Sequence, residues 1–99
     1  MNLTENQKKH LRRLGHALDP IVLLGQRGLT DAVVREMAQA LADHELVKAR
    51  APGIDRDQRD ATLAALAERT DSTLVQRIGH VGLFFRPNPK LSRIVLPGR

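Results

Sequence analysis

A loop with two glycines and one cation lies near the start of the chain, directly after a short apolar run. Gly25 and Gly28 bracket the loop, and Thr30 is a residue type that begins helices. We expect both glycines to adopt positive φ and to let the backbone come close to a ligand. We also expect Gln26 and Arg27 to face solvent. The unpaired N–H groups at the start of the following helix carry partial positive charge, so the loop predicts a phosphate-binding turn.

The spacing of the glycines separates this loop from a nucleotide-hydrolysing P-loop. Only two residues stand between them, and no Gly-Lys-Ser or Gly-Lys-Thr follows. KH domains clamp a nucleic-acid backbone with a turn that is bracketed in the same way. The alternative is an ordinary strand-to-helix turn in which the glycines serve only the geometry of the backbone.

No combination of residues predicts catalysis or metal binding. The chain has no cysteine, which excludes disulfides and thiolate nucleophiles. His10, His16 and His80 lack the spacing of metal ligands. His44 precedes Glu45, but it continues the apolar face of a helix, so we expect a packed histidine and no acid–base pair. The sequence therefore predicts no enzyme, no cofactor, no metal site and no small-molecule substrate.

The charge of the chain favours a polyanionic partner. Lys and Arg number 16 against 11 Asp and Glu, which gives a net charge of +5. The segment from Ser72 onward has no acid, whereas Asp55 to Asp71 contains five. Such segregation predicts one basic face and one neutral or acidic face. The cations expected on the basic face, besides Arg27, are Lys9, Arg12, Arg13, Lys48, Arg50 and Arg86.

These cations differ in the geometry that the sequence gives them. Lys9, Arg12 and Arg13 recur on one side of the first predicted helix. This side could contact a polyanion, or it could simply be the solvated polar face of the helix. Lys48 and Arg50 share one side of a strand, which argues that this part of the sheet is not fully covered. Arg86, Lys90 and Arg93 are expected to help electrostatically without a fixed geometry.

Capping residues and periodicity predict three helices and four strands. The first helix begins at the capping box Thr4-x-x-Gln7 and ends before Asp19-Pro20, and Asp55 can cap the third helix. The short apolar run 21–24 is expected to be a strand buried on both faces. The leucines that mark the buried face of the first helix are Leu11, Leu14 and Leu18. The other elements are helices over 31–44 and 55–70, strands over 45–50, 74–78 and 81–86, and an extended basic tail over 88–99.

This order of elements, α-β-α-β-α-β-β, predicts an α/β fold with a four-stranded mixed sheet. Helical crossovers between the early strands require parallel pairing of these strands, and right-handed connections place the crossover helices on one face. The last strand must run antiparallel to its neighbour, because only Gly79-His80 joins the two. Phe84 and Phe85 point to opposite faces, and one of them is expected in the core. With no Trp or Tyr in the chain, stacking of bases on the sheet is not expected.

Length and the apolar pattern limit the number of domains and the location that we expect for the protein. The 99 residues are enough for one domain over 1–99 and for no second core. The first residues lack the order of a signal peptide, and no apolar run approaches the ~20 residues that span a bilayer. We expect a cytoplasmic monomer without a membrane partner.

Four short motifs occur in the order and spacing of a known family. They are Leu24-Gly25-x-x-Gly28-Leu29-Thr30, His44-Glu45-Leu46-Val47-Lys48, Val75-Gln76-x-Ile78-Gly79 and Phe85-Arg86-Pro87-Asn88. Together they resemble the YhbY-type CRM domain, which is named for chloroplast RNA splicing and ribosome maturation. The resemblance covers nearly the whole chain, from about Leu3 to Pro97.

This resemblance implies a fold like the C-terminal domain of translation initiation factor three, preceded by an extra helix. It also implies non-catalytic RNA binding and, for a single-domain bacterial member, association with rRNA in precursors of the large ribosomal subunit. Two positions depart from the usual pattern. Phe85 stands where a Tyr is common, and Gln26-Arg27 stands where Lys-Gly or a similar pair is frequent. The second departure moves the expected phosphate contact to Arg27.

Three other functions remain open at this point. The basic face could dock an acidic ribosomal protein or another assembly factor, which would make the protein an interaction adaptor. Non-specific binding of DNA would satisfy the same charge pattern. An enzyme that modifies nucleic acid is poorly supported, because the chain offers no nucleophile, metal site or cofactor loop.

Overall fold

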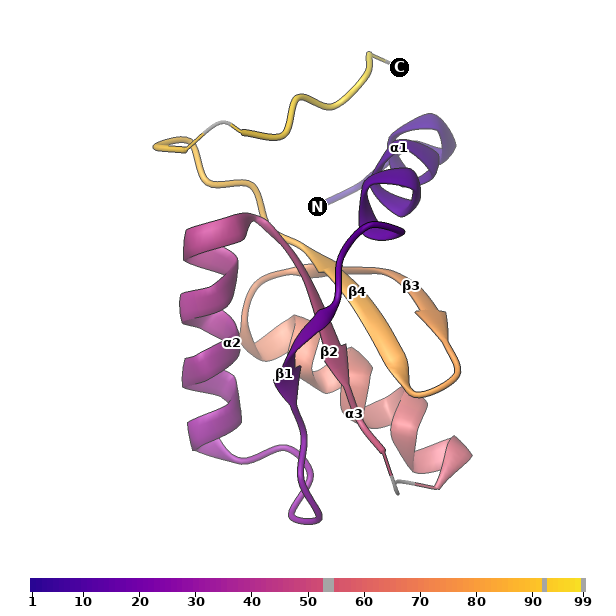
Figure 1. The fold of residues 1–99 in the computed structure, drawn as a ribbon, viewed down its shortest axis with the longest axis vertical. Coiled ribbons are helices and arrows are strands. Elements are labelled where there is room, and N and C mark those ends of the chain that lie inside the picture. The colour runs from indigo at the N-terminus through magenta and orange to yellow at the C-terminus, as the bar shows by residue number, and fades with distance from the viewer. Residues whose placement is uncertain (53–54, 92, 99) are drawn as a thin grey trace.

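The computed structural model describes residues 1–52, 55–91 and 93–98, and it contains the predicted elements in the predicted order (Figure 1). The capping residues that were read from the sequence begin all three helices, because Thr4, Thr30 and Asp55 each accept a backbone N–H with their side chains. The elements are α1 (Glu5–Gly15), β1 (Pro20–Leu23), α2 (Asp31–His44), β2 (Leu46–Arg50), α3 (Arg56–Arg69), β3 (Thr73–Ile78) and β4 (Val81–Phe85).

The four strands form one mixed sheet in the order β1-β2-β4-β3. β1 pairs with β2 in parallel, whereas β4 pairs antiparallel with both β2 and β3. The predicted fold class, with an antiparallel last strand, is therefore confirmed. β4 lies between β2 and β3, so the crossover through α3 does not end in a directly paired parallel strand.

Two separate cores lie on the two faces of the sheet. α2 and α3 cover one face, as predicted, and their apolar residues form the larger cluster with Val22, Val47 and Phe84. α1 and the C-terminal segment cover part of the other face, where Leu11 packs with Phe85. Figure 1 shows α1 and the C-terminal segment at one end of the sheet, which leaves the rest of that face without a helix above it.

Both phenylalanines belong to the core. Phe84 is buried among α2 and α3, and Phe85 is buried beneath α1, because neighbouring residues of a strand point to opposite faces. Since the chain has no Trp or Tyr, no such ring lies exposed on the sheet. Both phenylalanines are thus unavailable as an aromatic platform for successive bases, in agreement with the expectation from the sequence.

β1 differs from the prediction of a strand buried on both faces. Val22 is buried, but Ile21 and Leu23 are 54% and 59% exposed. The physical reason is its place at the edge of the sheet, on the part of the face that α1 leaves open. The apolar run is continuous, yet only one side of it is covered.

The buried face of α1 also differs from the prediction. Leu11 and Gly15 are buried, whereas Leu14 and Leu18 are each 37% exposed. Gly15 permits a close approach to β4, because a Cβ atom at this position would lie 2.7 Å from Cδ2 of Leu83. The helix therefore lies close to the sheet at its glycine and ends there, so Leu14 is turned aside and Leu18 lies beyond the helix.

The described residues of the C-terminal segment, 88–91 and 93–98, form no helix or strand, as predicted, but they are docked on the domain. Ile94 and Leu96 pack into the smaller core, and the Gln7 side chain donates a hydrogen bond of 3.1 Å to the carbonyl of Pro97. Residues 92 and 99 of the predicted tail lie outside the described residues. The tail is thus a fixed cover of the second face.

Candidate nucleic-acid interface

The glycine loop forms a tight turn between β1 and α2. The N–H of Gly28 donates to the carbonyl of Gly25 at 2.9 Å, and Gly28 has a φ of 68°. Gly25 does not have positive φ, so the prediction for both glycines is wrong at this residue. A Cβ atom added at either glycine would meet nothing within 4 Å. The backbone of the turn is therefore open to a ligand, and its conformation requires only Gly28.

The start of α2 follows the turn as the sequence predicted. The hydroxyl of Thr30 accepts a hydrogen bond of 3.1 Å from the N–H of Val33. Asp31 stands in the first helical turn and pairs with Arg69 of α3 at 2.8 Å. The hydrogen bond and the charge of the Arg69 guanidinium hold the pKa of the Asp31 carboxyl below its ordinary value. This acid was not among the residues predicted for the site, and Arg69 partly compensates its charge beside the turn.

The predicted cations Arg27 and Arg50 lie at the turn. Arg27 is exposed at its tip beside Gln26, which is also exposed. Arg50 is exposed at the end of β2, where its backbone carbonyl accepts from the N–H of Leu24 at 2.9 Å. Parallel pairing of β1 with β2 thus brings Arg50 beside the first residue of the loop, although 25 positions separate it from Gly25 in the sequence.

The cations of α1 form a second group at the other end of the molecule. Figure 1 shows the turn between β1 and α2 at the opposite end of the sheet from α1. One hollow is lined by Gln76 of β3, by His16 directly after α1, and by the helix residues Lys9, Arg12 and Arg13. The two predicted groups of cations are therefore not brought together into one compact site.

Lys48 lies between these two groups. It is half-buried in the middle strand β2, and its Nζ donates a hydrogen bond of 3.1 Å to the carbonyl of Leu18. The same side chain lines a groove with Arg12 and His16. The predicted side-sharing of Lys48 and Arg50 is consistent with the structure, since Val47 and Ala49 point into the larger core instead.

Arg86 has a fixed structural position, contrary to the prediction of a cation without set geometry. Its two terminal nitrogens donate to the carbonyls of Thr70 and Ala38, each at 2.9 Å. The guanidinium thereby joins the end of α3 to the middle of α2. Because both nitrogens are used in this way, we leave Arg86 out of the proposed interface.

The prediction for His44 and Glu45 is reversed in the structure. His44 is exposed, whereas Glu45 is 1% exposed and has a φ of 65°. The Glu45 carboxylate accepts from the N–H groups of Asn88 and Arg93, at 2.8 and 3.0 Å. Helix α2 ends one residue before the positive φ turns the chain, which carries His44 outward and Glu45 inward. The carboxylate is occupied by backbone donors, so this pair gives no acid–base chemistry.

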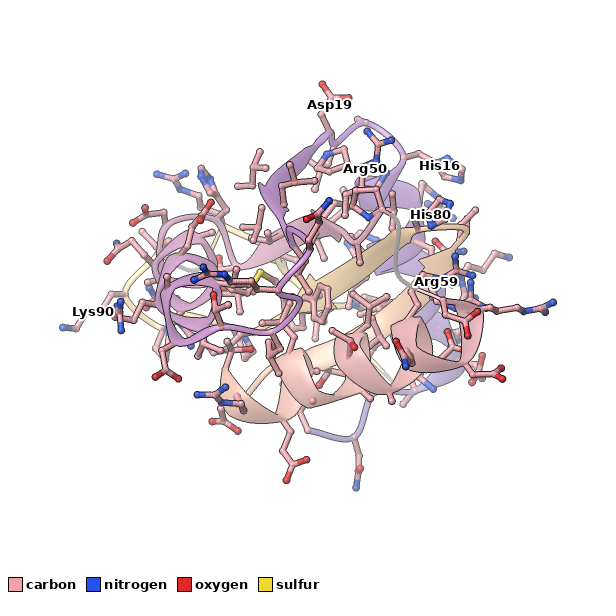
Figure 2. All side chains as sticks on the ribbon, turned by 90° about the horizontal axis from the view of Figure 1, so that it is seen from below. His16, Asp19, Arg50, Arg59, His80 and Lys90 are labelled. Carbon is pink, nitrogen blue, oxygen red and sulfur yellow. The ribbon has the colours of Figure 1, made fainter. Side chains whose placement is uncertain are left out.

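A further pair was not foreseen from the sequence. Nη1 of Arg59, on α3, lies 2.9 Å from Nδ1 of His80 in the β3–β4 turn, and Arg59 is 8% exposed. Figure 2 shows the two side chains near each other on one side of the molecule. The residues are 21 positions apart, and a lone arginine on a helix normally faces water. No signal in the sequence could have found this contact.

The described residues contain neither a metal-binding cluster nor a membrane-spanning helix. No group of three or more His, Cys, Asp or Glu side chains there could hold a metal ion. In the same part of the chain, no helix has the length and apolar character needed to cross a bilayer.

The fold and the turn together define a class of small α/β module: a mixed sheet with two helices on one face, an added N-terminal helix on the other, and an open glycine turn with adjacent cations. The family model of the CRS1 / YhbY (CRM) domain matches residues 3–86. The chain belongs to this family.

Two similar proteins have names that fit this family. A probable RNA-binding protein of Pseudomonas aeruginosa is 43% identical over 90 residues, which are 91% of this chain and 86% of that protein. An RNA-binding protein of Haemophilus influenzae is 39% identical over 96% of this chain and 95% of its own length. Both names describe RNA binding.

A solved structure confirms the fold. The solution structure of a hypothetical Staphylococcus aureus protein, described as a candidate RNA-binding protein, has a TM-score of 0.84 to this chain. The two share 32% sequence identity, and the similarity covers 97% of this chain and 100% of the other. Membership of the CRM family together with these relatives supports RNA binding as the general function.

Proposed function

We propose that this protein is a non-catalytic, cytoplasmic RNA-binding protein that holds rRNA in precursors of the large ribosomal subunit during their maturation. The observation that carries the proposal is the open glycine turn, where a Cβ at Gly25 or Gly28 would meet nothing within 4 Å beyond the adjoining residues of the chain, with exposed Arg27 at its tip. The ribosomal target follows from the resemblance to single-domain YhbY-type proteins.

In the proposed complex, main-chain N–H groups of the turn and of the start of α2 donate to phosphate oxygens. Arg27 and Arg50 add charge beside them, and guanidinium groups form strong hydrogen bonds to phosphate. The cations of α1 extend the contact to the other end of the sheet. Such an interface reads phosphates and the shape of the folded RNA more than base sequence.

Salt dependence tests the electrostatic part of this proposal. If about four to six phosphates are neutralised, the logarithm of the affinity for an rRNA fragment falls with the logarithm of salt at a slope of about −3 to −6. The measurement is fluorescence anisotropy with labelled large-subunit rRNA fragments and with duplex DNA as the competitor. A flat response, or a preference for the DNA, would contradict it.

The turn itself is tested by Gly25→Leu, with Gly98→Leu as a matched control. A Cβ atom has open space at both glycines and neither has positive φ, so the two positions accept a side chain without backbone strain. We expect Gly25→Leu to weaken rRNA binding at least tenfold, because the side chain keeps a phosphate away from the backbone, and Gly98→Leu to bind like the wild type. Unchanged binding by a folded Gly25→Leu protein refutes the role of the turn.

The adaptor alternative has a separate readout. Replacing Arg27 and Lys48 by Glu should weaken rRNA binding if the basic face contacts RNA. If the face docks an acidic protein, the same double variant leaves the rRNA titration unchanged and loses proteins from a pull-down.

A further inference from the structure

A groove of about 330 Å³ runs across the sheet beyond the end of α1. Its lining includes the cations Arg12 of α1 and Lys48 of β2, His16 directly after α1, and the apolar side chains of Ile78 of β3 and Val81 of β4. The volume lies within the range of ~300–1,000 Å³ that is typical of small-ligand sites. The groove thus combines a cationic rim with aliphatic walls.

The groove exists because α1 is short and sits close to the sheet. Gly15, the last residue of the helix, rests against Leu83, and the chain then leaves toward β1. The bond from Nζ of Lys48 to the carbonyl of Leu18 holds this connection in place. The space beyond the helix end is therefore framed by fixed elements and stays open to solvent.

We propose that this groove binds one unpaired nucleotide of the RNA. The aliphatic walls provide apolar surface for the faces of a base, and the rim provides charge for the adjoining phosphate. Gln76, which lines the same groove, carries both a donor and an acceptor for the polar edge of a base. The inference rests on the proposed function and deepens it, because it names single-stranded RNA as the form that is bound here.

Charge and continuity favour this occupant over a segment of another protein. Arg12, His16 and Gln76 also line the neighbouring hollow, which adds Lys9 and Arg13. The cationic rim therefore continues along α1, as a sugar-phosphate backbone on either side of the nucleotide requires. Asp19 lines the groove as well, but its carboxylate points away from the molecule (Figure 2).

A base that is still stacked in a duplex does not present its face to the apolar side chains of the groove. Within a double helix a base shows only its edges in the grooves, whereas sequence-tolerant contacts to unpaired bases use the faces of the rings. Both phenylalanines are buried, so the base rests on aliphatic side chains and not on an aromatic platform. The structure thereby predicts a preference for single strands that phosphate contacts alone do not produce.

The test uses the full chain with two probes, an unstructured eight-nucleotide RNA and the duplex that it forms with its complement. The variants Ile78→Asn and Gln76→Ala change a groove wall and the hydrogen-bonding group without changing the net charge. Val95→Asn is the matched control, because Val95 is 78% exposed on the tail and does not line the groove. Thermal unfolding shows that each variant is folded.

We expect the wild type to prefer the single strand, and each groove variant to lose about fivefold in affinity for it, equivalent to ~1 kcal/mol. Binding of the duplex and the response of Val95→Asn should not change. If the groove variants bind both probes like the wild type, while Gly25→Leu weakens both, the groove inference is overturned and the proposed function stands. If the wild type binds no RNA, both are overturned.

Discussion

The buried carboxylate of Glu45 accepts a hydrogen bond of 2.8 Å from the backbone N–H of Asn88, 43 residues later in the chain. The side-chain amide of Asn88 in turn donates to the carbonyl of Ala42 at 2.8 Å, near the end of α2. These two contacts attach the C-terminal segment to the end of α2. The segment then continues over the smaller core, where it meets α1.

Replacing Glu45 by Gln should loosen this attachment. The amide group keeps one acceptor but places a donor against a backbone donor, so the free energy of unfolding should fall by about 1–3 kcal/mol. Denaturant unfolding measures the change, and the exposed residue Glu36 on α2 supplies the control, Glu36→Gln. Equal stability of the two variants would show that the tail is not held through Glu45.

The two glycines of the turn should respond differently to alanine. Gly28→Ala places a Cβ at a φ of 68° and should cost about 1 kcal/mol of folding stability. Gly25→Ala meets open space at an ordinary φ and should leave stability unchanged or slightly higher. Thermal unfolding of the two proteins compares them directly. A larger loss at Gly25 than at Gly28 would contradict the turn geometry.

Arg86 should matter for folding and not for the electrostatics of RNA binding. Arg86→Leu leaves the carbonyls of Thr70 and Ala38 without their donor, which should cost about 1–3 kcal/mol. Below the melting temperature of the variant, the salt slope of rRNA binding should equal that of the wild type. A slope that becomes shallower by about one unit would instead place Arg86 on a phosphate.

The pair of Asp31 with Arg69 predicts a small dependence of stability on acid pH. Because folding lowers the pKa of Asp31, the pair contributes fully above the pKa of the unfolded chain, ordinarily ~3.9, and loses this contribution as pH falls through the lower folded value. Asp31→Asn should therefore unfold at a lower temperature than the wild type at neutral pH, with a difference that shrinks in acid. Asp57→Asn, at a first-turn acid of α3, is the control. A difference that grows in acid would be inconsistent with the pair.

Local signals in the sequence were sufficient for the elements and their order. Thr4, Thr30 and Asp55 cap the three helices, and the alternation of β2 assigns Val47 and Ala49 to one core. These features depend on residues close together in the chain, so the pattern contains the required information.

The errors concern contacts between distant segments. The exposed side of β1 follows from its place at the sheet edge, and Leu14 is turned aside because Gly15 meets Leu83. Arg86 is anchored by carbonyls of two helices that the sequence does not place near it. In the candidate site, the glycine turn could be predicted because its residues are adjacent in the chain. The separation of its cations from those of α1 could not, because it depends on how the strands are ordered in the sheet.

The bond between Gln7 and Pro97 has a practical meaning for anyone who attaches something to this protein. It holds the first helix and the C-terminal segment together at one end of the domain, and the glycine turn lies at the opposite end (Figure 1). A dye, a purification handle or a fused partner attached near residue 7 or residue 97 would consequently leave the turn unobstructed. The groove beyond the end of α1 would be closer to the attached group.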